Sequence, residues 1–98
     1  MSINSDSIER LYQAVLSLET VDECKMFFED LCTIRELLDM AQRLDAAILL
    51  DNKVSYQNIA KDVKISTATI GRVSRCLNYG SGGYRLVLDR LTEKGEEK

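Results

Sequence analysis

The sequence predicts an all-α fold of about six helices in a single domain of 98 residues. Pro is absent and only 5 residues are Gly, so long segments are free to be helical. Apolar residues recur at spacings of three and four, as they do on one face of an α-helix. Helix-capping side chains precede these apolar runs, and no segment shows a substantial β-strand pattern.

The first half of the chain predicts three helices. Residues 5–7 offer N-caps for the first helix. Thr20–Glu23 and Thr33–Glu36 have the form of capping boxes, which open the second and third helices. The third helix is the longest and reaches about Asn52. The apolar positions of the three helices are Ile8, Leu11, Tyr12, Val15 and Leu16, then Cys24, Phe27, Phe28 and Leu31, then Ile34, Leu37, Leu38, Ala41, Leu44, Ile48 and Leu49.

The segment 55–77 predicts a helix-turn-helix, in which two short helices are joined by a tight turn. Ser55 is the expected cap of the first helix, and Ser66 or Thr67 is the expected cap of the second. The small residue at the crossing of the two helices is Ala60, the turn is Lys64-Ile65, and the apolar wedge toward the body of the protein is Ile59, Val63, Ile65, Ile70 and Val73.

Glycines are expected to end this motif. The segment 78–83 breaks the second helix, because glycine adopts positive φ at little cost. A last helix begins at Tyr84, and the charged tail 93–98 is expected to fray. Leu86, Val87, Leu88 and Leu91 are the apolar residues of this last helix.

Composition argues against several classes of protein. The chain shows neither a signal peptide nor an apolar run of about 18 residues, so we expect a cytoplasmic protein without a membrane partner. Cys24, Cys32 and Cys76 are odd in number and form no CxxC pair, which favours reduced thiols that pack as small hydrophobic residues over disulfides or a metal site. The absence of His removes the commonest general base and metal ligand. We therefore expect no catalytic residues, no metal and no cofactor.

The charge is unevenly distributed along the chain. Residues 1–50 hold 4 Lys/Arg and 10 Asp/Glu, a net of −6, whereas residues 51–98 hold 9 Lys/Arg and 6 Asp/Glu, a net of +3. Between Val54 and Arg85 five basic residues stand against one acid, Asp62. A basic half on an acidic scaffold suits DNA binding in one orientation, although a short chain can show such asymmetry by chance.

The second helix of the motif has the composition of a DNA-reading helix. The side chains of its first turn are small, so the helix can approach the edges of bases closely. Threonine hydroxyl groups can hydrogen-bond to bases, and alanine methyl groups can contact thymine methyl groups. Arg72 lies one turn further on and can reach guanine or phosphate. Lys64 stands where this motif often has Gly, and a left-handed turn there costs about 1 kcal/mol. The expected contacts with double-stranded DNA are Tyr56, Gln57, Lys61, Lys64, Ser66, Thr67, Ala68, Thr69, Arg72 and Arg75.

The first two helices carry more large apolar side chains than a short chain can bury. A second copy of the chain can cover these faces, so we expect a homodimer, with a compact monomeric bundle as the alternative. A dimer also presents two reading helices, which can meet two half-sites about 34 Å apart.

Several of these residues carry a resemblance to the tryptophan repressor superfamily. The pattern consists of Thr33-Ile34-Arg35-Glu36, Ser55, Ala68-Thr69-Ile70 followed by Arg72, and Leu77. The segments 75–80 and 82–84 are more similar to the YerC/YecD-type branch of this family. The resemblance covers roughly residues 8–92. It implies an interlocked, all-helical homodimer that regulates transcription at a two-fold operator.

The resemblance also implies a candidate ligand pocket formed by Thr33, Arg43, Arg72, Val73 and Cys76. In tryptophan-binding relatives, arginines matching Arg43 and Arg72 sandwich the indole ring. Val73 stands where those relatives carry Gly, and Cys76 replaces a Ser that bonds the amino group. We therefore expect the tryptophan response to be lost, at a cost of about 3 kcal/mol in binding. Alternatively, Arg43 forms a surface or interface salt bridge, for example with Asp39.

Three functions compete at this stage. A sequence-specific DNA-binding regulator, a repressor, fits the motif best. A protein-interaction module that keeps the fold without DNA fits the acidic first half, and a repressor that depends on tryptophan or another small ligand is a further alternative. An enzyme is disfavoured, because the glycine-rich segment 80–83 is better explained as a hinge before the last helix than as a phosphate-binding loop.

Overall fold

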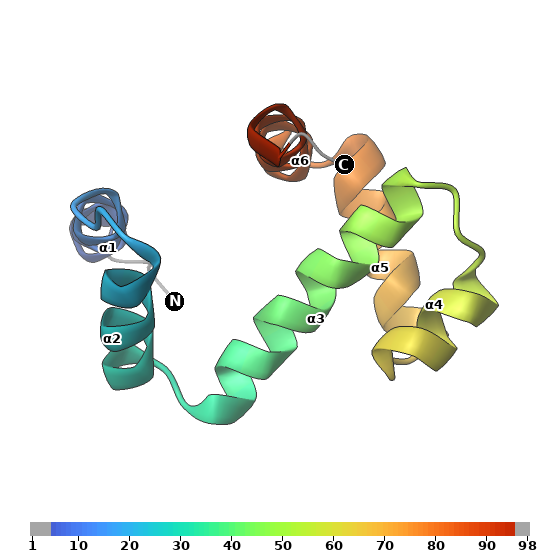
Figure 1. The fold of residues 1–98 in the computed structure, drawn as a ribbon, viewed down its shortest axis with the longest axis horizontal. Helices are drawn as coiled ribbons and strands as arrows, with labels where there is room; N and C mark the ends of the chain where they lie inside the picture. Colours follow the sequence, from blue (N-terminus) through green and yellow to red (C-terminus); the bar gives the residue numbers. More distant parts are fainter. Residues whose placement is uncertain (1–4, 96–98) are drawn as a thin grey trace. The chain divides into compact units, whose positions relative to one another are not determined.

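The structure is a computed structural model that describes residues 5–95, and this part of the chain is helical without strands (Figure 1). Six helices in the described residues confirm the all-α prediction. Internal contacts divide the chain into two compact units, residues 1–37 and 38–98, and the boundary falls inside the third helix. The helices are α1 (Ser5–Leu16), α2 (Val21–Leu31), α3 (Ile34–Asp51), α4 (Tyr56–Val63), α5 (Thr67–Tyr79) and α6 (Gly83–Gly95).

The first unit contains α1, α2 and the start of α3, and its predicted capping boxes are present. The backbone N–H of Glu23 donates to Oγ1 of Thr20 over 3.0 Å, while the carboxylate of Glu23 accepts from the N–H of Glu19 over 2.8 Å. At the start of α3 the N–H of Glu36 donates to Thr33, and the Glu36 carboxylate accepts from the N–H of Thr33. Both helix starts therefore satisfy backbone donors that would otherwise lack partners.

The first unit has no buried side chain among its described residues. Phe27 and Phe28 contact each other edge to face, with ring centroids 5.5 Å apart, but both remain partly exposed. Large apolar side chains of α1 and α2 are exposed, including Leu16 at 76% and Val21 at 84%. These helices form an amphipathic unit whose apolar faces lack a cover within the unit.

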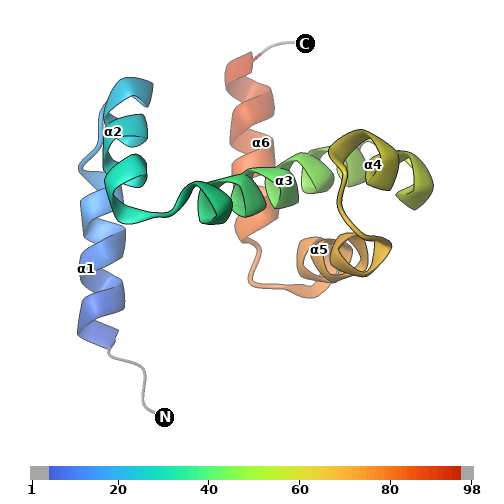
Figure 2. The same cartoon turned by 90° about the horizontal axis from the view of Figure 1, so that it is seen from below.

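The core of the second unit lies where α4 and α5 meet the second half of α3 (Figure 2). The α3 contribution is two fully buried alanines, Ala46 and Ala47, whose small side chains allow close helix approach. α6 adds one buried residue, Leu88. Partly buried side chains, among them Leu44, Leu49, Val63, Leu77 and Tyr84, surround this core. The fully buried branched residues are Ile59, Ile70 and Val73.

α5 is longer than the sequence pattern indicated. We expected Asn78 to begin the break, but α5 continues to Tyr79, and the Asn78 side chain donates to the carbonyl of Ser74 over 2.9 Å. Gly80 ends the helix, and a Cβ there would overlap the carbonyl oxygen of Cys76. Gly82 follows with a φ of 91°, a conformation that favours glycine.

The limits of α6 also differ from the expectation. The helix begins at Gly83, one residue before Tyr84, and it continues to Gly95. Residues 93–95 of the tail that was expected to fray are thus helical, and residues 96–98 lie outside the described part of the chain.

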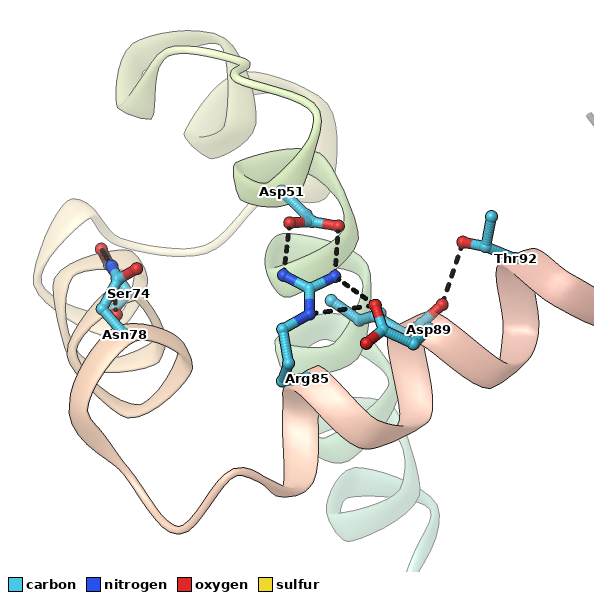
Figure 3. Close-up of polar contacts among 7 residues, drawn as sticks. Asp51, Ser74, Asn78, Arg85, Asp89 and Thr92 are labelled. Carbon is cyan, nitrogen blue, oxygen red and sulfur yellow. Dashed lines mark hydrogen bonds and ion pairs between the residues drawn. The ribbon is translucent and has the colours of Figure 1, made fainter.

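An ion pair fastens α6 to the end of α3 (Figure 3). The Arg85 guanidinium donates to both carboxylate oxygens of Asp51, over 2.8 and 2.9 Å. Its Nε donates to Asp89, one turn further along α6, over 3.0 Å. The hydrogen bonds from Arg85 lower the pKa of Asp51, and the two carboxylates raise the pKa of Arg85. Arg85 therefore acts as a structural cation that links two helices.

This linkage makes the stability of the fold depend on pH. We expect Asp51→Asn to lower the free energy of unfolding near neutral pH and to have progressively less effect in acid. The folded-state pKa of Asp51 is depressed, so its contribution is present above the unfolded-state pKa and is lost as the pH falls through the folded-state pKa. Denaturant titrations at equal protein concentration, from about pH 7 to about pH 2, measure this difference.

Asp45→Asn is the matched control, because Asp45 is an exposed carboxylate on the same helix. A difference between wild type and Asp51→Asn that persists unchanged to the lowest pH contradicts the assignment.

Candidate nucleic-acid interface

Each helix of the motif is started by the serine that precedes it. The N–H of Asn58 donates to Oγ of Ser55 over 3.2 Å, which caps α4. The N–H of Thr69 donates to Oγ of Ser66 over 3.1 Å, which caps α5. The cap of α5 is therefore Ser66 and not Thr67, whose side chain is left exposed in the first turn. Serine is one of the strongest N-cap residues, so both helix starts are locally encoded.

The apolar wedge fixes which face of α5 is turned outward. Ile70 and Val73 are buried against the body of the unit together with Ile59 of α4. With 3.6 residues per turn, the opposite face of α5 carries Ala68, Arg72 and Arg75. These three residues are exposed, as the sequence pattern predicted.

Most residues predicted to contact DNA are exposed on the two helices and their turn. Tyr56, Gln57 and Lys61 are exposed on α4, and Lys64 is exposed in the turn. Thr69 differs, because it is half-buried and its hydroxyl accepts a hydrogen bond from Oγ of Ser66 over 3.0 Å. The Thr69 side chain thus takes part in the hydrogen bonds at the start of α5 and is not fully exposed on the outer face.

The cations of the motif are available to an external partner. Among the described residues, no carboxylate lies within ion-pair distance of Lys61, Lys64, Arg72 or Arg75. Arg85, which the charge pattern grouped with them, is instead held by two aspartates. Four of the five basic residues between positions 54 and 85 therefore lack a described carboxylate partner, and against the single acid Asp62 they leave the motif with net positive charge.

Lys64 adopts the left-handed conformation that the sequence led us to expect. Its φ and ψ are 66° and 45°, and its N–H donates to the carbonyl of Ala60 over 3.0 Å, which closes the end of α4. Glycine is preferred at such a helix end, because a Cβ is strained there. A lysine is therefore held at the turn of the motif against its local preference.

The five residues of the candidate ligand pocket lie in different surroundings. Thr33 belongs to the first unit, and its hydroxyl caps α3. Arg43 and Arg72 are exposed in the second unit, whereas Val73 is only 2% exposed and packs in the core. Cys76 is exposed and lines an apolar hollow of about 490 Å³ together with Leu44, Gly80, Ser81, Gly83, Tyr84 and Val87.

Two further features bear on the site. No group of three or more Cys, Asp or Glu side chains in residues 5–95 is arranged to hold a metal ion. None of the helices in the same residues is long and apolar enough to cross a membrane. Sequence reasoning missed the pairing of Arg85 with Asp51 and Asp89.

The strain at Lys64 is open to a direct test. We expect Lys64→Gly to raise the free energy of unfolding by up to about 1 kcal/mol relative to Lys64→Ala, because only glycine relieves the left-handed strain. Denaturant unfolding of the two variants at equal concentration measures the difference. Both variants lose the same charge, so a glycine variant no more stable than the alanine variant contradicts the expectation.

Comparison with known proteins places this geometry in a family. The family model described as Trp repressor protein matches residues 6–92. The protein YerC of Bacillus subtilis (strain 168), described as uncharacterized, is 43% identical over 95 residues, which cover 97% of this chain and 91% of YerC. The crystal structure of a TrpR-like protein from Eubacterium eligens ATCC 27750 superposes with a TM-score of 0.86 at 47% identity and covers 95% of this chain and 94% of its own. The chain therefore belongs to the Trp repressor family, in a branch that includes YerC.

Proposed function

We propose that this protein is a sequence-specific DNA-binding transcriptional regulator, a repressor, that acts as a homodimer and reads a two-fold operator through α5. Membership of the Trp repressor family supports a DNA-binding regulator in general. The observation that carries the proposal is the outer face of α5, where Ala68, Arg72 and Arg75 are exposed beside cations that have no described carboxylate partner. Behind this face Ile59, Ile70 and Val73 are fully buried and fix which side of α5 is turned outward.

The chemistry of this face matches the major groove. The methyl group of Ala68 can meet thymine methyls, the hydroxyl of Thr67 can bond a base or a phosphate, and Arg72 can pair with guanine. Free N–H groups at the start of α5 favour a nearby phosphate. Lys61, Lys64 and Arg75 then serve as phosphate contacts that position the helix without reading sequence.

The homodimer is supported by apolar surface that the single chain leaves uncovered. In the described residues sixteen large hydrophobic side chains are exposed, whereas six hydrophobic residues are buried. Eleven of the sixteen lie between Ile8 and Met40, on α1, α2 and the first half of α3. So many exposed apolar groups mark an interface in a protein of this size. A second copy also supplies the second reading helix that a two-fold site requires.

The same exposed surface favours a second candidate function, a protein-interaction module. The first fifty residues are acidic, with a net charge of −6, and carry most of the exposed apolar groups. A partner protein bound there would leave α5 unused. DNA binding explains the four available cations and this alternative does not, so the regulator remains the proposal.

The proposed function is tested by selecting bound fragments from the source genome at about 0.15 M salt, with and without tryptophan. We expect recovery of a two-fold sequence that does not depend on tryptophan. Val73 and Cys76 replace the glycine and serine of tryptophan-binding relatives, and this motivates the expected independence. Recovery only with tryptophan overturns the ligand prediction, and recovery of nothing above background favours the interaction module.

Variants then assign roles on the recovered operator. Arg72→Ala is expected to weaken binding by more than about tenfold and to relax the preference at one base pair. Lys61→Ala is expected to weaken binding to all sequences and to reduce the slope of log affinity against log salt by about one. Arg90→Ala removes an exposed cation on α6 and is the control, which is expected to leave the operator affinity and the salt dependence unchanged. Equal effects of Arg72→Ala and Arg90→Ala contradict the assignment of α5 as the reading helix.

The dimer has a separate test. We expect wild-type protein to sediment as a dimer at micromolar concentration, and its unfolding midpoint to rise with protein concentration. Leu11→Glu and Leu38→Glu place a charge on the exposed apolar surface and are expected to shift the protein toward monomer. Tyr79→Ser is the control, because Tyr79 is 87% exposed at the end of α5. A monomeric wild type with a concentration-independent midpoint contradicts the proposal.

A further inference from the structure

Gly71 lies inside α5 for no reason that the fold supplies. A Cβ built at Gly71 meets no atom within 4 Å, and no positive φ is recorded for this residue. The glycines that follow it are different, because a Cβ at Gly80 would overlap backbone and Gly82 has a φ of 91°. Alanine would fit at position 71 without strain or collision.

The presence of glycine at this position costs stability. Glycine in the interior of a helix destabilises it relative to alanine, because its backbone loses more freedom on folding. In the described helices the other glycines, Gly83 and Gly95, stand at the two ends of α6. Gly71 is the fifth residue of a helix that begins at Thr67. A residue that weakens the helix without helping it to pack points to a role outside the fold.

The neighbours of Gly71 on the helix surface indicate that role. Residues three and four positions apart adjoin on a helix, so Gly71 lies between Thr67 and Arg75 and beside Ala68. Arg72 follows it directly. These four residues are exposed and belong to the surface proposed to contact DNA, whereas Gly71 itself and Ser74, three positions after it, are half-buried. The buried Val73 occupies the opposite side of α5, and the buried Ile70 lies between these two sides.

We infer that Gly71 is a specificity-determining residue of the DNA-reading surface, where the missing side chain lets the 5-methyl group of a thymine contact the α5 backbone. This inference rests on the proposed function. The methyl group protrudes into the major groove, and apolar contact is how proteins recognise it. The Cα of Gly71 and the methyl group of Ala68 offer an apolar surface for such a contact.

Lys64 is the opposite case in the same motif, because it carries a side chain at a position where the backbone favours glycine. The turn at Lys64 would be easier for glycine, yet it carries a charged side chain. The helix at Gly71 would be more stable with alanine, yet it carries no side chain. Both departures are disadvantages for the isolated fold, and both are advantages for a surface that must contact DNA closely.

The test combines Gly71→Ala with operators in which deoxyuridine replaces thymine at one position of each half-site. Deoxyuridine lacks the 5-methyl group and leaves base pairing unchanged. We expect Gly71→Ala to raise the thermal midpoint by a few degrees and to weaken binding to the natural operator at least about tenfold. At one thymine position, deoxyuridine should weaken wild-type binding and should restore most of the affinity of Gly71→Ala.

Gly83→Ala is the matched control, because a Cβ there also meets no atom within 4 Å and the residue lies outside α4 and α5. It is expected to leave operator affinity unchanged. The inference is overturned if Gly71→Ala binds the natural operator with wild-type affinity. It is also overturned if Gly71→Ala loses affinity that no deoxyuridine substitution restores, because the group close to position 71 would then be the sugar–phosphate backbone. If the wild-type protein selects no operator at all, the proposed function fails and the inference falls with it.

Discussion

The buried wedge formed by Ile59, Ile70 and Val73 against Ala46 and Ala47 holds the second unit together. Each of these five side chains is at most 2% exposed. Two consecutive alanines let α4 and α5 approach α3 closely, and the branched side chains then set the rotation of α5 about its axis. That rotation decides which residues face outward. The outer face of α5 is therefore a consequence of core packing, and a change of packing at Ile70 or Val73 would redirect the residues proposed to read DNA.

The helix starts were predictable from the sequence, because their signals are local. Thr20, Thr33, Ser55 and Ser66 each accept a hydrogen bond from a backbone N–H three residues later, so the donor and the acceptor are visible in one short segment. The exposed and buried faces of α5 were predictable for a related reason, since helical periodicity alone separates them. The left-handed turn at Lys64 followed from recognising the motif. For the candidate site, the sequence thus indicated which side chains are exposed on α4 and α5.

Interactions between distant segments were not predictable in this way. Asp51 and Arg85 are 34 positions apart, and their pairing depends on how α6 packs near the end of α3. Charge counting therefore grouped Arg85 with the cations of the motif, although two carboxylates neutralise it. Asn78 was grouped with the glycines that break the helix, whereas its side chain bonds back to Ser74 within α5 and the helix continues to Tyr79. Only the folded chain brings Arg85 within reach of Asp51, whereas the bond from Asn78 to Ser74 is local to α5.

The exposed apolar surface of the first unit links stability to the proposed function. With no fully buried side chain among its described residues, this unit gains most of its further apolar burial from whatever covers its helices. In the proposed dimer that cover is a second chain, so ordering of α1 and α2, association of the chains and presentation of two α5 helices form one concentration-dependent equilibrium. A two-fold operator draws on the same equilibrium, because it binds the associated form alone. Occupancy of such an operator then rises more steeply than in proportion to protein concentration, as long as the free chain is largely dissociated. In the proposed dimer, the small core and the exposed apolar helices thus make operator occupancy depend on protein concentration.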